Sequence, residues 1–120
     1  MLNLDTHILL YALAGILEPH ERRVLTDNGE WGISAIVLWE IEKLYQKGRI
    51  QHGLDYPPLV ASLARLHVWP ITIEVCRNLR SLDFQSDPAD ELIAATSLTH
   101  KVPLVTRDTR IRVSKVIQCL

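Results

Sequence analysis

This chain has few cysteines, the residue type that marks disulfide-stabilised and zinc-binding proteins. Only Cys76 and Cys119 are cysteines among the 120 residues, and neither forms a CxxC pair or lies at zinc-binding spacing from a histidine. This scarcity argues against a disulfide framework and against a zinc site, and it is typical of a reducing compartment. We expect both thiols to be small core or tail residues.

Long apolar runs are missing too. No run approaches the roughly 20 residues of a membrane-spanning helix, and the opening segment 1–5 lacks the basic start of a secretory signal. Apolar residues make up 48% and charged residues 22% of the chain, close to the values of average globular proteins. We therefore expect one folded domain spanning residues 1–120, a cytoplasmic location and no membrane contact.

Charge of one sign is not in excess, since the formal net charge is −1 at pH 7. The distribution is uneven, however, because Arg107, Arg110, Arg112 and Lys115 fall within nine residues near the C-terminus. Such a run usually marks a solvated face, and a phosphate-binding stripe is the alternative. The three arginines are our candidates for contact with the phosphates of a nucleic acid, because a guanidinium group can hold a phosphate through two hydrogen bonds.

What the chain does contain is an alternation of short strands and helices. Caps, turn residues and apolar periodicity predict helices at residues 6–14, 19–26, 35–46, 59–66, 74–82 and 87–100. Strands are expected at residues 1–5, 31–34, 68–71, 102–105 and, as a last edge strand, 116–118. This alternation predicts an α/β fold with a parallel sheet, helices on both faces, and ligands bound beyond the carboxyl ends of the strands.

Four acidic residues lie in separate parts of the chain, each beside an apolar segment: Asp5, Glu40, Asp90 and Asp108. Asp5 and Asp108 follow strands at their carboxyl ends, and the other two would arrive on helices near the same edge. Carboxylates gathered in water-poor surroundings repel one another, so a fold tolerates them mainly when a cation neutralises them. Oxygen-only ligands favour Mg²⁺ or Mn²⁺ over zinc.

Three of these acids also have structural explanations that require no metal. Asp5 could cap the first helix, and Asp108 could be a turn residue. Asp90 lies in the first turn of a helix, where the macrodipole favours acids. We assign the capping of that helix to Asp87, which precedes Pro88, and we assign Asp90 to the site because it lies one turn deeper on the apolar stripe.

Glu40 borders an apolar helix stripe that includes Val37 and Leu44. Pairing with Lys43 or Lys47 at helical spacing would explain Glu40 equally well, for a gain of roughly a few tenths of a kcal/mol. Taken singly, each acid is undecided. Because four independent accidents would be needed to place acids at the functional edge of one sheet, we favour a shared carboxylate site.

Four ordered motifs span the chain: Leu4–Leu13, Ile33–Ile41, Asp87–Thr96 and Pro103–Asp108. Together, and in this spacing, they resemble the PIN-domain ribonucleases, especially the VapC-type toxins of bacterial toxin–antitoxin pairs. The resemblance covers essentially the whole chain and implies a PIN-like three-layer fold with a short, mostly parallel sheet. Segments 15–31 and 48–57 match only loosely, which leaves the choice of substrate open because loops around a site usually set specificity.

By this resemblance Asp5, Glu40, Asp90 and Asp108 occupy the four acidic positions of the PIN site, and Thr106 occupies a polar position that supports it. The resemblance implies an Mg²⁺-dependent endoribonuclease, with Mn²⁺ as the alternative ion. In such an enzyme, water activated by the metal attacks the RNA phosphodiester, and no side-chain nucleophile is needed. The resemblance also implies a homodimer that binds a cognate antitoxin protein.

Two further expectations concern surfaces. Apolar area for a dimer is expected from Leu59, Leu63 and Leu66, or from Leu9 and Leu13 on the first helix. Single-stranded or looped RNA is the expected substrate, since a small acidic cleft admits an extended strand more readily than a stacked duplex.

Two other classes of protein remain open. A receiver domain of a signalling relay has a similar length and an acidic Mg²⁺ pocket, but it requires adjacent acids after the first strand and a lysine after a late strand. A PIN fold that only binds RNA or a protein is the second, and the four intact acids argue against it. Chemistry by His or Ser is disfavoured, because His7 reads as a wall residue and Ser34 lacks His–Asp partners.

Overall fold

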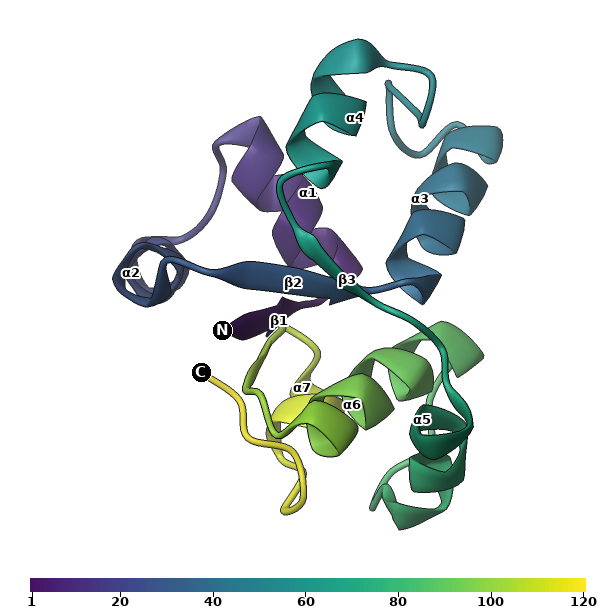
Figure 1. Cartoon of the computed structure of the whole chain (residues 1–120). Coiled ribbons are helices and arrows are strands. Elements are labelled where there is room, and N and C mark those ends of the chain that lie inside the picture. The colour runs from purple at the N-terminus through teal and green to yellow at the C-terminus, as the bar shows by residue number, and fades with distance from the viewer.

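A computed structural model describes all residues 1–120 and contains one four-stranded sheet. The strands are β1 (Leu2–Leu4), β2 (Trp31–Ser34), β3 (His67–Trp69) and β4 (Leu104–Val105). They lie in the order β3-β2-β1-β4, and every neighbouring pair is parallel (Figure 1). The predicted parallel sheet is confirmed. Because β1 has a neighbour on each side, the residue that follows it emerges at the middle of the sheet's carboxyl edge.

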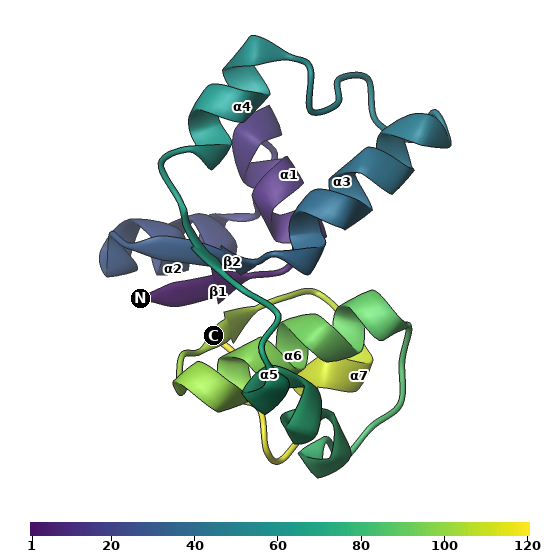
Figure 2. The same ribbon diagram turned by 45° about the vertical axis from the view of Figure 1, so that its right-hand side comes forward.

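Helices cover both faces of this sheet (Figure 1, Figure 2). One face carries α1 (Thr6–Ala14), α3 (Ile36–Gln46) and α4 (Pro57–Leu63). The other carries α5 (Ile73–Asn78), the 3₁₀ turn Leu79–Ser81, α6 (Pro88–His100) and α7 (Thr109–Arg112), while α2 (Pro19–Asn28) precedes β2 at its starting end. The predicted three-layer arrangement is confirmed. None of the helices has the length and apolar character needed to cross a membrane.

Both ends of α1 follow from local chemistry. Asp5 has extended backbone and accepts a hydrogen bond from the backbone N of Thr6 (2.8 Å), so it is the N-cap. Gly15 adopts φ of 73°, a left-handed conformation that glycine tolerates without strain, and ends the helix. The capping role considered for Asp5 is therefore confirmed, and it coexists with a second role described below.

The start of α6 differs in one detail from the expected cap. Asp87 occupies the N-cap position before Pro88, as predicted, but its side chain makes no capping hydrogen bond. The side chain of Glu91 instead turns back to the residue before the N-cap, where its Oε2 accepts a hydrogen bond from the backbone N of Ser86 (3.0 Å). The carboxylate of Glu91 thereby fixes the turn that precedes the helix.

The predicted edge strand at residues 116–118 does not form. The chain there makes an isolated bridge between Leu104 and Cys119, supported by hydrogen bonds from Leu104 N to Gln118 O (2.8 Å) and from Leu120 N to Leu104 O (3.1 Å). Since β4 has only two residues, it offers too short a ladder for a fifth strand. This contact still holds the C-terminal segment against the sheet.

Three other expectations fail at the periphery. Helix α4 ends at Leu63 rather than at residue 66, and α5 passes into a 3₁₀ turn after Asn78. Cys76 is exposed, because helical periodicity turns Val75 inward and its neighbour outward, so it is not a core residue. Cys119 is half-buried in the C-terminal tail, as expected, and burial raises the pKa of its thiol.

The core lies between the sheet and the helices on both faces. Because both faces are covered, the strands are apolar almost without interruption: Leu2, Leu4, Ile33, Leu104 and Val105 are at most 1% exposed. This burial also includes part of the surface that we expected to mediate a dimer. The side chains of Leu9, Leu59 and Leu63 belong to the core, so the prediction is wrong for these three, whereas Leu66 is partly buried and Leu13 is well exposed.

One polar residue interrupts the apolar strands. Asn3 in β1 is fully buried, and its Nδ2 donates hydrogen bonds to the carbonyl of Ile93 (3.0 Å) and to Oγ of Ser97 (2.9 Å). Its Oδ1 has no partner. The two hydrogen bonds fix α6 along the axis of β1, and this alignment places Asp90, one turn before Ile93, beside the end of β1.

Candidate metal centre

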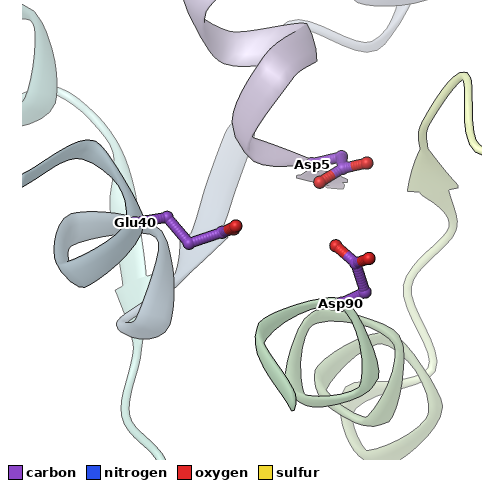
Figure 3. Close-up of side chains that lie close together, drawn as sticks. All are labelled: Asp5, Glu40 and Asp90. Atoms are coloured by element: carbon purple, nitrogen blue, oxygen red, sulfur yellow. The ribbon is translucent and has the colours of Figure 1, made fainter. Parts of the chain in front are cut away.

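Three of the four predicted acids meet at the carboxyl edge of the sheet. Asp5 follows β1, Glu40 lies in the second turn of α3, and Asp90 lies in the first turn of α6. One carboxylate oxygen from each lies within 4.8 Å of the others. The three side chains point toward one another across the space between these elements (Figure 3). We call Asp5, Glu40 and Asp90 the carboxylate triad.

Hydroxyl groups hold two members of the triad in place. Oγ1 of Thr106 donates to Oδ2 of Asp5 (2.6 Å), which agrees with the supporting position expected for Thr106. The same Oγ1 accepts a hydrogen bond from the backbone N of Asp108 (3.0 Å). On the other side, Oγ1 of Thr6 donates to Oε1 of Glu40 (2.5 Å). Both carboxylates are therefore oriented by groups on the strand ends and the first helix.

Ser86 orients the third member. Its Oγ donates to Oδ2 of Asp90 (2.9 Å) from the turn before α6. Neither Ser86 nor Thr6 was predicted from the sequence as a site residue. A hydroxyl directly after Asp5, and another four residues before Asp90, were the available signals, but neither spacing distinguishes a site residue from an ordinary helix-start residue.

Burial dominates the electrostatics of the triad. Asp5 is 8% exposed, and burial raises its pKa against the opposing effect of the hydrogen bonds from Thr106 and Thr6. Burial likewise raises the pKa of Glu40 and of Asp90, and the neighbouring negative charges raise both further. No Lys or Arg pairs with the triad, since the one ion pair of the chain lies elsewhere. The triad is thus a group of like charges without a cation of its own.

Asp108 lies close to the triad but outside it. Its Oδ1 caps the short helix α7 by accepting hydrogen bonds from the backbone N of Arg110 (2.9 Å) and Ile111 (3.4 Å). Its negative charge nevertheless raises the pKa of both Asp5 and Asp90, so it contributes to the field of the site. The turn-residue explanation considered for Asp108 is consistent with this position.

The fold and these motifs can now be compared with known proteins. The family model described as "PIN domain" matches residues 3–116. The chain belongs to the PIN-domain family. Ribonuclease VapC22 from Mycobacterium tuberculosis is 31% identical to this PIN domain, over 91% of this chain and 88% of that protein. The resemblance to PIN-domain ribonucleases and VapC-type proteins is thereby confirmed.

Solved structures share the fold of this PIN domain. VapBC2 from Rickettsia felis bound to a promoter DNA fragment aligns with a TM-score of 0.75 and 21% identity, covering 100% of this chain and 98% of that one. DNA-bound VapBC from Salmonella typhimurium aligns with a TM-score of 0.73 and 19% identity, covering 99% and 96%. At these identities the likeness establishes the three-dimensional fold only.

Arg107, a predicted phosphate contact, is already engaged in the PIN domain. Its Nε and Nη2 donate to the two carboxylate oxygens of Glu21 (2.6 and 2.7 Å), and its guanidinium carbon lies 4.2 Å from the ring centroid of Tyr11. Glu21 is 5% exposed, and its hydrogen bonds with Arg107 lower its pKa. The planar fork of Arg107 therefore fastens α2 to the segment after β4, rather than standing free for RNA.

The other two candidate arginines are also partly engaged. Nη1 of Arg110 donates to the carbonyl of Gln85 (2.7 Å). Nη1 of Arg112 donates to the carbonyls of Thr106 (3.0 Å) and Leu120 (3.1 Å). Each keeps other N–H groups available, so phosphate contact by Arg110 and Arg112 stays a prediction.

Proposed function

We propose that this PIN domain is an Mg²⁺-dependent endoribonuclease of a toxin–antitoxin pair. The observation that carries the proposal is the carboxylate triad, in which three like charges converge without a compensating cation. The relative named Ribonuclease VapC22 supports RNA as the substrate. Two solved neighbours are VapBC structures and a third is a toxin–antitoxin complex from Klebsiella pneumoniae, which supports a cognate antitoxin as partner.

The donor set of the triad fits a divalent cation. Carboxylate oxygens alone favour Mg²⁺, with Mn²⁺ as the alternative. A cation would also relieve the burial and mutual repulsion that raise the pKa of Asp5, Glu40 and Asp90. In this proposal the triad holds the ion, and Asp108 contributes as the fourth carboxylate of the site through Oδ2, which makes no hydrogen bond within the chain.

Each residue of the triad has its own role in the proposed hydrolysis. When bound, Mg²⁺ supplies charge that polarises the scissile phosphate and favours deprotonation of the attacking water. Asp5, held by Thr106, and Asp90, held by Ser86, are the fixed anchors. Glu40 orients the attacking water, and its own position is set by the hydroxyl of Thr6.

Location and assembly complete the proposal. The toxin–antitoxin complexes among the solved neighbours favour action in the cytoplasm on cellular RNA. We also propose a homodimer, for which Leu13 is the one well-exposed side chain among the leucines predicted at its surface. Light scattering at micromolar concentration tests this point, and a monomeric mass would refute it.

Cleavage of RNA tests the central proposal. Single-stranded RNA incubated with the wild-type PIN domain should be cut in Mg²⁺ or Mn²⁺, and EDTA should stop the reaction. Asp5→Asn, Glu40→Gln and Asp90→Asn should each lower kcat by at least about 100-fold, a size typical of losing an electrostatic group at a reacting centre. Full activity of purified Asp5→Asn would refute the metal mechanism.

Asp87→Asn is the matched control for these variants. It removes the same charge from the start of the same helix as Asp90→Asn, yet the side chain lies outside the triad and makes no capping hydrogen bond. We expect its kcat to stay within about threefold of the wild type, since a change confined to surface charge seldom exceeds roughly 0.5 kcal/mol.

A further inference from the structure

A cavity of about 650 Å³ lies between α1, the end of α3 and α4. Its size falls within the roughly 300–1,000 Å³ of ordinary ligand pockets. The cavity adjoins the carboxylate triad at two points. His7, two residues after Asp5, lines the cavity, and so does Leu44, one helical turn after Glu40. The cavity therefore lies next to the triad along α1 and α3, where a strand held at the triad would continue.

Flat rings form part of its wall. His52 and Tyr56 stack on each other, with centroids 3.7 Å apart and ring planes inclined by only 10°. Both residues are exposed, Tyr56 by 38%, so the outer side of this stacked pair is open to a ligand. From α1 the ring of Tyr11 also lines the cavity, held by Arg107. Preformed stacks of this kind suit a planar ligand, because the ordering of the rings has already taken place.

A free positive charge lies on the same wall. Arg49 is exposed, and its guanidinium group makes no hydrogen bond or ion pair within the chain. In this respect it differs from Arg107, Arg110 and Arg112, which all donate to groups of the protein. A planar apolar surface beside an unpaired guanidinium group matches the chemistry of a nucleobase and its adjoining phosphate.

We propose that this cavity binds one base of the RNA strand next to the scissile phosphate. The base stacks on the His52–Tyr56 pair, and Arg49 contacts a neighbouring phosphate. The inference rests on the proposed ribonuclease function and adds a substrate subsite to it. Because every base has a flat face, stacking on rings holds single-stranded RNA with little sequence preference and requires an unpaired base, which excludes duplex from this subsite.

A cycle of protein and RNA changes tests the subsite. Short single-stranded RNAs are prepared with one abasic nucleotide at successive positions around the cleaved bond, and kcat/KM is measured for the wild type and for Tyr56→Ala. One abasic position should lower wild-type kcat/KM by about 5- to 150-fold, the range for loss of one base–aromatic stack. The same abasic RNA should cost Tyr56→Ala almost nothing further, because the stack is already gone.

Conservative and matched variants separate stacking from folding. Tyr56→Phe keeps the ring and should retain the wild-type response to the abasic RNA. Arg49→Ala should raise KM and reduce the salt dependence of RNA binding, whereas Arg77→Ala, which removes an exposed arginine on the opposite face of the sheet, should not. Thermal denaturation of each variant shows whether it is folded.

Binding in EDTA keeps the inference independent of catalysis. Fluorescence anisotropy of the intact and abasic RNAs should give the same dependence on Tyr56 even if no cleavage occurs, so failure of the proposed function and failure of the subsite are distinguishable. Equal losses from the abasic nucleotide in wild type and Tyr56→Ala would overturn the subsite. The subsite would also be overturned if the Tyr56 and Arg49 variants bound and cut RNA normally but no longer bound a co-expressed antitoxin. The cavity would then be a docking site for protein.

Discussion

Removing the hydroxyl of Ser86 is the clearest test of how this site is organised, because a single hydrogen bond connects that hydroxyl to the triad. Ser86→Ala removes the bond from Oγ to Oδ2 of Asp90 (2.9 Å) and leaves the backbone contact with Glu91 intact. Hydrogen bonds to charged groups contribute about 1.5–3 kcal/mol when buried. Since Asp90 is only partly buried, we expect about 1 kcal/mol here, which corresponds to roughly a fivefold change in an equilibrium constant.

The assay is RNA cleavage as a function of Mg²⁺ concentration. Loss of the hydrogen bond should raise the pKa of Asp90 further, because that bond lowers it in the wild type. Because the carboxylate is then less well oriented for the ion, the half-saturating Mg²⁺ concentration should rise about fivefold near neutral pH. It should rise by more at lower pH, where protons compete with Mg²⁺ for the carboxylate. At saturating Mg²⁺, kcat should return to within about twofold of the wild type.

Ser114→Ala is the matched control, because Oγ of Ser114 donates to Oδ1 of Asp83 (2.5 Å) on an exposed surface. It breaks the same kind of bond outside the site and should leave the Mg²⁺ dependence unchanged. Ser86→Thr keeps the hydroxyl and should restore most of the lost affinity. An unchanged Mg²⁺ dependence for Ser86→Ala, or a loss of kcat that no Mg²⁺ concentration reverses, would refute the positioning role.

Three further predictions concern stability. Because burial raises the pKa of Asp5, the folded protein favours the protonated carboxyl and ionisation opposes folding. The protonated carboxyl contributes stability that is complete below the ordinary pKa of 3.8 and is lost as pH rises through the raised value. In EDTA, Asp5→Asn should therefore be more stable to urea than the wild type at pH 7.5 and lose that advantage toward pH 4; a deficit at both pH values would contradict this. Asn3→Asp should lower the free energy of unfolding by about 3–5 kcal/mol, because it places an unpaired charge in the core. Asn3→Leu also removes the unpartnered Oδ1 and should lower it by only about 1 kcal/mol. Urea midpoints equal to that of the wild type in both variants would show that Asn3 does not align α6. Gly32→Ala should cost about 1–3 kcal/mol in thermal or urea denaturation, because the added Cβ would lie 2.6 Å from a ring carbon of buried Trp69; unaltered stability would mean that the ring moves aside freely.

The parts of the fold that sequence predicts best are those with strong local signals. The Asp–Pro start of α6 and the left-handed Gly15 after α1 each fix an element boundary through backbone chemistry alone. Periodicity then identifies the inward face, and the carboxyl edge of a parallel sheet collects whatever follows its strands. For this reason Asp5 and Asp90 could be assigned to one site before their distance was known.

Contacts between distant segments have no such local signal. The fork of Arg107 on Glu21 joins residues 86 positions apart, and nothing in the run of basic residues near the C-terminus reveals it. The exposure of Cys76 was likewise not predictable from sequence, because a rotation of α5 by a fraction of a turn decides whether this side chain is buried. Some of the leucines expected at a dimer surface lie in the core instead, because sequence alone does not show how much apolar area one domain buries.

The two roles of Asp5 show how stability and chemistry are linked in this PIN domain. One carboxylate oxygen caps α1 through the backbone N of Thr6, and the other accepts the hydroxyl of Thr106 beside the triad. The cap stabilises the ionised carboxylate while burial destabilises it, and burial prevails because the pKa is raised. The fold thus holds an acid in place at an energetic cost that a bound cation would offset. Mg²⁺ should therefore stabilise the wild type against unfolding, and Asp5→Asn much less, since a ligand that binds only the native state raises its stability.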